Sequence, residues 1–182
     1  MNRLFITIFL SISILLMAFC SKVVAQTTTG LTPTGIKTNT NMAISAANAP
    51  NHKVLFQYLK ASGLLKQAAA AKGQYTVFAP TDAAFSELPE ADRRDLLLPS
   101  SKQKLIKLLT YHVVKGRLTS DQLRDGQTLT NLTGQILLIH KQGNTITIED
   151  GRGTVADVIQ SDIRTTNGVV YSVSRVLQHI VE

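Results

Sequence analysis

One stretch decides the fold of this chain, and it reads Tyr75-Thr76-Val77-Phe78-Ala79-Pro80-Thr81-Asp82-Ala83-Ala84-Phe85. Its apolar first half predicts a buried strand that ends at Pro80, since proline has no backbone N–H for a strand ladder. Thr81 and Asp82 are residues that cap helix N-termini. We therefore expect a strand followed at once by a helix whose first turn buries Phe85.

Two later stretches complete a pattern of three. In Leu109-Thr110-Tyr111-His112-Val113-Val114-Lys115-Gly116 an amphipathic helix ends, and in 167–177 an Asn-Gly turn starts an alternating apolar strand. In this order the three stretches resemble the conserved boxes of the fasciclin-like domain family, over residues 42–181. The last box departs from the family pattern, which usually has His where Tyr171 stands and Asp where Ser174 stands.

The resemblance implies an α+β fold, a β wedge or sandwich of short antiparallel strands with helices packed at one side. The spacing of the apolar residues agrees with this fold. They recur at helical spacing in the first half of the chain and alternate with polar residues, as in strands, in the second half. Predicted helices begin at Lys53, run over 64–71 and precede His112, and a charged connection covers 89–99. The predicted strands after Gly116 are 128–130, 136–140, 145–149, 155–160 and 169–176.

The N-terminus predicts export. Asn2-Arg3 precedes an apolar run from Leu4 to Phe19, and the small residues before Gln26 suit cleavage after Ala25. Lipid attachment at Cys20, the only cysteine, is the alternative, although Phe19 is not the small residue that usually precedes such a cysteine. The sequence thus predicts a secreted or periplasmic protein with no membrane span after cleavage.

The predicted organisation has three parts. Residues 1–25 are a signal peptide, 26–41 a flexible linker rich in Thr and Asn, and 42–182 one fasciclin-like domain. The formal charge of +7 suits an anionic polysaccharide or simply solubility. The chain has no tryptophan and no basic cluster interleaved with aromatics, which argues against nucleic acid.

No residue pattern predicts catalysis, a cofactor or a metal. The four histidines are far apart in sequence, and no nucleophile elbow, phosphate loop or dinucleotide motif is present. His112 lies at helical spacing from Leu105, Leu108 and Leu109, on an apolar face, which favours a structural imidazole over a general base. We expect a non-enzymatic protein.

Two groups of residues are singled out. The first is an adhesion or ligand surface that the resemblance implies, consisting of Leu108, Leu109, Tyr111, His112, Val113 and Val114. The second is a structural motif consisting of Thr76, Phe78, Pro80, Thr81, Asp82, Phe85, Asn167 and Gly168.

Two functions remain open at this point. The first is a cell-surface or extracellular-matrix adhesion module, whose partner is a surface protein, an anionic polysaccharide or another copy of itself. The second is a carrier of a small hydrophobic ligand, carotenoid-like or lipid-like, in a cleft of the domain. The residues expected to line such a cleft are Leu96, Leu97, Leu98, Leu108, Leu109 and Val113.

Overall fold

A computed structural model describes residues 35–70 and 74–178. The helices among them are α2 (Met42–Asn48), α3 (Lys53–Ser62), α4 (Leu64–Ala70), α5 (Asp82–Ser86), α6 (Glu90–Asp95), the 3-10 helix η1 (Pro99–Ser101) and α7 (Lys102–Tyr111). The strands are β1 (Tyr75–Pro80), β2 (Val113–Lys115), β3 (Thr128–Thr130), β4 (Ile136–Gln142), β5 (Thr145–Glu149), β6 (Val155–Thr165) and β7 (Gly168–Val173). The predicted signal peptide and most of the predicted linker lie outside these residues.

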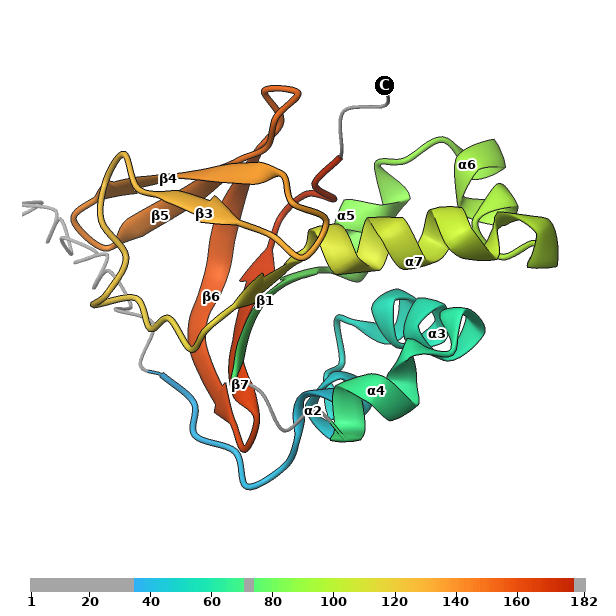
Figure 1. The fold of residues 1–182 in the computed structure, drawn as a ribbon, viewed down its shortest axis with the longest axis horizontal. Coiled ribbons are helices and arrows are strands. Elements are labelled where there is room, and N and C mark those ends of the chain that lie inside the picture. Colours follow the sequence, from blue (N-terminus) through green and yellow to red (C-terminus); the bar gives the residue numbers. More distant parts are fainter. Residues whose placement is uncertain (1–34, 71–73, 179–182) are drawn as a thin grey trace, which may run out of the picture. The chain divides into compact units, whose positions relative to one another are not determined.

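The described strands form one sheet in the order β2-β1-β7-β6-β5-β4-β3. Neighbours are antiparallel except β1 and β7, which run parallel from Tyr75 opposite Gly168 to Pro80 opposite Val173. A bridge between Val114 and Asn131 links the two ends of the order, so the sheet curves round almost into a barrel (Figure 1). This is the expected α+β architecture, with one parallel pairing among the expected antiparallel strands.

Two apolar cores lie on the two faces of the curved sheet. The inner core fills the space that the sheet encloses, and Phe78, Tyr111 and Tyr171 are its largest buried side chains. The outer core joins the helices to β1 and contains Ala79 and Phe85. Because side chains alternate along a strand, Phe78 and Ala79 serve different cores.

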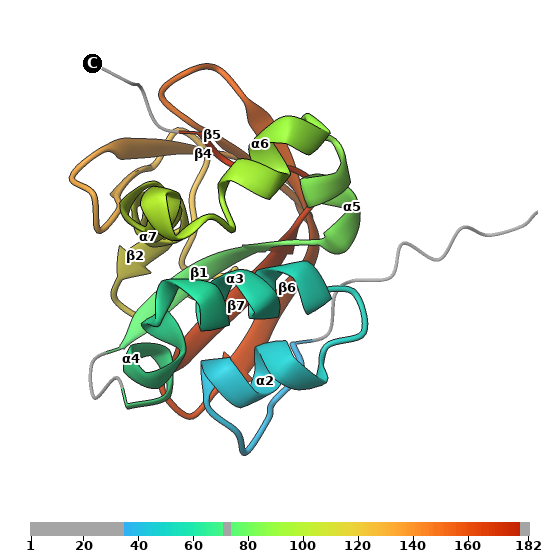
Figure 2. The ribbon, with the colours of Figure 1, turned by 90° about the vertical axis from the view of Figure 1, so that its right-hand side faces the viewer.

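Helices α2, α3 and α4 lie over the outer face of β1, β7 and β6 (Figure 2). Gly63 ends α3 in the left-handed conformation at φ 82°, which glycine adopts without strain, and α4 starts immediately after it. Thr81 caps α5 by accepting the Ala84 N–H at 3.2 Å, as its sequence context predicts.

The connection over 89–99 is more ordered than its composition predicts. It contains the helix α6, in which Arg94 pairs with Glu90, followed by η1. A six-residue helix offers too few apolar positions for a periodic signal, so the sequence analysis missed it.

The last residues of the predicted linker contact the sheet. Lys37 forms a parallel bridge with Arg164 on β6, and the Thr38 N–H donates to the Arg164 carbonyl at 2.8 Å. All described residues belong to one compact unit, Thr32–Glu182. No helix among them is long and apolar enough to cross a bilayer.

Candidate functional site

A groove of about 1000 Å³ lies between helices α2 to α4 and the outer face of the sheet. Its floor comes from β1, β7 and β6, including Val77, Val170 and Ile163. Its helical wall includes Ala43, Leu55 and Leu64, and it extends to Leu109 and Val113 at the end of α7. We call this hollow the groove.

The groove is apolar and almost uncharged. Its described lining contains no lysine, arginine or glutamate, and Asp82 is its one carboxylate. That carboxylate accepts the Val54 N–H at 2.8 Å and so caps the start of α3. A lining whose surface is mainly apolar, with neutral polar groups and little charge, is typical of sites for small uncharged molecules.

Large aliphatic side chains remain exposed at the groove. Ile36, Leu132 and Ile159 line it with 47%, 48% and 58% of their surface exposed. They come from segments far apart in sequence, so only the fold places them round one hollow.

A polar pair lies among these apolar groups. His52, at the residue before α3, and Ser172 on β7 both line the groove, and His52 Nε2 is 3.1 Å from Ser172 Oγ. The imidazole also hydrogen-bonds the backbone of Ala79, and its burial lowers the pKa of His52. We call His52 and Ser172 the polar anchor.

The polar anchor is not a catalytic triad. In a triad the second ring nitrogen of the base bonds a carboxylate, whereas here the ring bonds the Ala79 backbone. Asp82 acts on His52 only through its charge. No local sequence pattern indicates the polar anchor, because its two members are 120 residues apart.

The residues of the predicted adhesion surface are mostly interior. Leu109, Tyr111, His112 and Val114 are buried, and Leu108 and Val113 are half-buried. Tyr111 and Val114 belong to the inner core, whereas Leu109 belongs to the outer one. Leu109, His112 and Val113 nevertheless line the groove, so the set remains a prediction as a ligand surface.

His112 is fully engaged in hydrogen bonds. Nδ1 donates to the Leu108 carbonyl at 2.8 Å, and Nε2 accepts the Leu177 N–H at 2.9 Å. This pair of bonds requires the neutral ring, and burial lowers the pKa of His112 to about 4. The imidazole therefore joins the end of α7 to the segment after β7.

The residues of the predicted structural motif occupy junctions of the fold. Thr76 Oγ1 donates to the Gly116 carbonyl at 2.8 Å and accepts the Leu118 N–H at 2.9 Å. Asn167 accepts the Met42 N–H at 3.0 Å and donates to the Ala68 carbonyl at 2.8 Å, which ties α2 and α4 to the β6–β7 turn.

Gly168 is required by a close backbone approach. A Cβ atom at this position would lie 2.2 Å from the Tyr75 carbonyl oxygen of the parallel neighbour β1. Pro80 ends β1, and Phe78 and Phe85 are fully buried in the inner and outer cores.

The leucines expected to line a cleft separate into two sets. Leu109 and Val113 line the groove, whereas Leu96, Leu97, Leu98 and Leu108 do not. Leu96 is buried in the outer core, and Leu97 and Leu98 are about half exposed beside η1.

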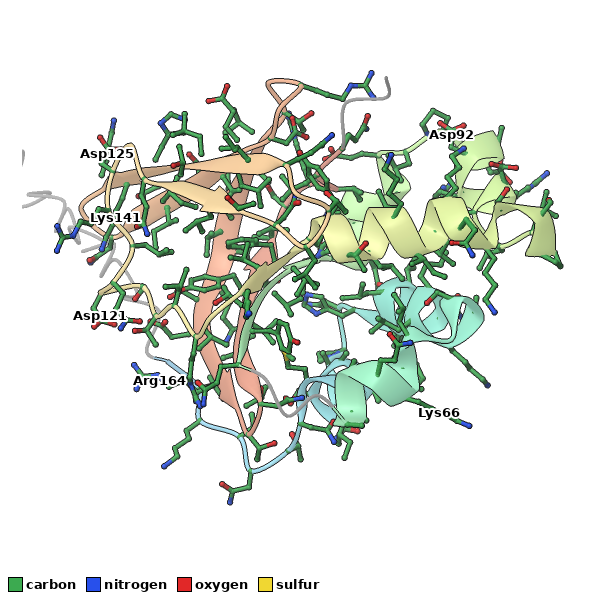
Figure 3. All side chains as sticks on the ribbon, viewed as in Figure 1. Lys66, Asp92, Asp121, Asp125, Lys141 and Arg164 are labelled. Atoms are coloured by element: carbon green, nitrogen blue, oxygen red, sulfur yellow. The ribbon has the colours of Figure 1, made fainter. Side chains whose placement is uncertain are left out.

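Charged groups gather on another side of the domain. Asp121, Asp125 and Lys141 lie well away from α3 and α4 (Figure 3). The Lys141 ammonium donates to the carbonyls of Ser120 and Leu123 at 2.7 and 3.0 Å, so it closes a loop. In the described part of the chain, no three His, Cys, Asp or Glu side chains are grouped as metal ligands would be.

Taken together, the curved, nearly closed sheet and its helical layer define an α+β domain with a groove between the two. A family model for the fasciclin domain matches residues 50–179. The chain therefore belongs to the fasciclin domain family.

Similar proteins agree with this membership. Protein sll1483 of the cyanobacterium Synechocystis is 39% identical over 134 residues, 72% of this chain and 69% of that protein. The immunogenic protein MPB70 of Mycobacterium bovis is 33% identical over 163 residues, 87% of this chain and 79% of that protein.

A solved structure shares the fold. The domain pair of the insect cell adhesion molecule fasciclin I superposes with a TM-score of 0.68 at 16% identity, over 76% of this chain. The match covers 51% of the fasciclin I chain. At this identity the likeness concerns the fold alone.

Proposed function

We propose that this chain is an exported, non-catalytic binding module that carries a small hydrophobic ligand in the groove. One observation carries this proposal, namely a hollow of about 1000 Å³ with an apolar and nearly uncharged lining. A cavity of this size and character can bury most of a small apolar molecule, and burial of apolar surface is the main source of its affinity.

Two further points support a binding role without catalysis. The polar anchor lacks the carboxylate that would orient a catalytic histidine. His112, the other histidine that is buried in the described part of the chain, uses both ring nitrogens to hold the backbone. Neither imidazole is therefore arranged to act on a substrate.

Export is proposed from the sequence of the N-terminus. If the signal peptide is cleaved after Ala25, mass spectrometry of the mature protein isolated from its native cells should give a chain that starts at Gln26. A diacylated N-terminus at Cys20 would instead show a lipoprotein, and an unprocessed chain would overturn export.

The groove is tested by filling it. Ala46 lines the groove from α2, whereas its exposed neighbour Ala47 does not. We expect Ala46→Trp to abolish binding of an apolar dye such as Nile red and to leave the protein without co-purifying lipid. The matched variant Ala47→Trp should bind the dye like the wild type. Equal binding by both variants would overturn the groove as the ligand site.

Adhesion is the second candidate. It is favoured by the exposed aliphatic side chains Ile36, Leu132 and Ile159, and by the description of fasciclin I as a cell adhesion molecule. Its partner would be a cell-surface protein, an anionic polysaccharide or a second copy of the chain. Beads coated with the wild type should attach to cells or aggregate, and Ile159→Glu should weaken this attachment. Val155, exposed on the same strand but outside the groove, gives the control Val155→Glu.

A further inference from the structure

The polar anchor narrows the class of ligand, and this inference rests on the proposed groove. We propose that the groove takes an apolar alcohol, an uncharged molecule whose hydroxyl group donates a hydrogen bond to Ser172 Oγ. The rest of the molecule is then an apolar body in contact with the aliphatic lining.

The first step is the position of the anchor. Ser172 lies opposite Ala79 in the parallel β1–β7 register, and His52 bonds to both residues. Val170 and Ser172 are two residues apart on β7, so both side chains point to the helical face and into the groove lining. The hydroxyl is thus held in place on the groove floor rather than free to rotate.

The second step is the direction of each hydrogen bond. The bond to the Ala79 backbone raises the pKa of His52, so the ring nitrogen there is a donor to a carbonyl. Burial, the larger effect, lowers the pKa of His52 and keeps the ring neutral near pH 7. Nε2 is then the unprotonated nitrogen, and the Ser172 hydroxyl donates to it across 3.1 Å.

The third step is what remains for a ligand. With its proton committed to His52, Ser172 Oγ offers only its lone pairs, and no described group of the protein is seen to donate to it. A ligand hydroxyl complements this acceptor. An ether or ester oxygen does not, because it cannot donate. Gln160 lies opposite Ser172 on β6 and lines the groove, and its amide N–H group can donate to the oxygen of the same ligand hydroxyl.

The fourth step excludes charged lipids. A carboxylate or phosphate headgroup in the groove would face Asp82 and would find no lysine or arginine in the described lining. Burying such an anion without a cationic partner is costly. The lining therefore favours a neutral polar end over a fatty-acid or phospholipid anion.

The experiment compares two probes that differ in one hydrogen-bond donor, the hydroxyl group. Retinol and retinyl methyl ether share a fluorescent apolar body, but only retinol can donate a hydrogen bond. Both are titrated into the wild type, into Ser172→Val, and into Ser174→Val, whose serine follows the last residue of β7 and does not line the groove. Binding is followed by probe fluorescence at pH 7.

We expect the wild type to bind retinol about three- to tenfold more tightly than the ether, the factor that one neutral hydrogen bond supplies. Ser172→Val should bind both probes with the affinity of the ether, and Ser174→Val should keep the preference. Ser172→Thr, which retains a hydroxyl, should also keep it.

The experiment distinguishes failure of the apolar-alcohol proposal from failure of the proposed groove function. Equal affinity of the wild type for both probes, or a preference that survives in Ser172→Val, overturns the apolar-alcohol proposal and leaves the groove standing. If neither probe binds the wild type, the proposed groove function itself falls. If Ser172→Val does not fold, the wild-type comparison and Ser172→Thr still decide the question.

Discussion

His112 and Leu177 are joined by a hydrogen bond of 2.9 Å between the imidazole Nε2 and the backbone N–H, across 65 residues of sequence. The same ring donates to the Leu108 carbonyl, so it ties the helix before β2 to the segment after β7. The bond from Leu177 requires an unprotonated Nε2, and therefore a ring that carries no positive charge. The central histidine of this fasciclin domain is therefore a structural cross-link.

The first prediction concerns acid. The pKa of His112 is lowered to about 4 in the folded protein, below its value of 6.5 in an unfolded chain. A lowered histidine pKa means that the unfolded state binds the proton more readily, so the stabilisation is complete above pH 6.5 and is lost as the pH falls toward 4. The loss reaches about 3 kcal/mol, to which His52 adds in the same direction. Urea unfolding at pH 7 and pH 4.5 measures it.

A variant of His112 tests whether this residue causes the loss of stability in acid. His112→Gln should be less stable at pH 7 but should flatten the fall in stability between pH 6.5 and 4. An unchanged slope in His112→Gln would contradict the assignment.

The second prediction concerns alkali. Burial raises the pKa of Tyr171, and the nearby charge of Asp162 adds to this. A raised tyrosine pKa means that stability is complete below pH 10 and falls as the pH rises above it. We expect the absorbance of tyrosinate at 295 nm to show a delayed step to which Tyr171 contributes, together with Tyr58 and Tyr111, whose pKa values burial also raises. Tyr171→Phe should reduce the amplitude of this delayed step by one tyrosine.

The same variant should also lose stability at neutral pH. The Tyr171 hydroxyl donates to the Leu118 carbonyl at 2.9 Å, and its removal leaves that buried carbonyl without this donor. The expected loss is about 1 kcal/mol by urea unfolding. An equal stability of Tyr171→Phe would show that the hydroxyl contributes nothing to the inner core.

The third prediction compares two glycines. One is required because a side chain would clash with a neighbouring strand, and the other because its backbone φ is positive. A Cβ at Gly168 would lie 2.2 Å from the Tyr75 carbonyl, whereas at Gly126, with φ 72°, nothing lies within 4 Å. We expect Gly168→Ala to cost about 3 kcal/mol through separation of β1 and β7. Gly126→Ala should cost about 1 kcal/mol from its backbone conformation alone. Similar losses in thermal or urea unfolding would refute the steric reason.

The fourth prediction tests a cap between two helices. The Asp82 carboxylate lies in the first turn of α5 but accepts the Val54 N–H at the start of α3. Asp82→Ala should lose about 1 kcal/mol, the usual worth of an N-terminal cap, and Asp82→Asn should keep most of it because the amide oxygen still accepts. Hydrogen exchange at Val54 would become faster only in Asp82→Ala. Equal protection in both variants would argue against the cap.

Local features of this protein were predictable from neighbouring residues. The strand that ends at Pro80, the Thr81 cap and the strand pairs after Gly116 all follow from proline geometry, capping and alternation, which act over a few residues. The six-residue helix α6 was missed because so short a segment has no apolar period.

The candidate site could not be predicted from local patterns, because its residues come from segments that are far apart in the sequence. The parallel pairing of Tyr75 with Gly168 and the contact between His52 and Ser172 each join segments more than ninety residues apart, and no local pattern records them. The predicted adhesion residues show the same limit, since their apolar spacing is equally suited to a surface patch and to a core.

Composition and short-range pattern thus specified most of the helices and strands, though not α2, α6 or β2, because those choices are governed by backbone geometry and the period of apolar side chains. The long-range packing of the chain settled which face of each segment is covered. This packing covers Tyr111 and His112, whereas Ser172 lies on the floor of the groove. The burial of a residue depends on which distant segments pack over it.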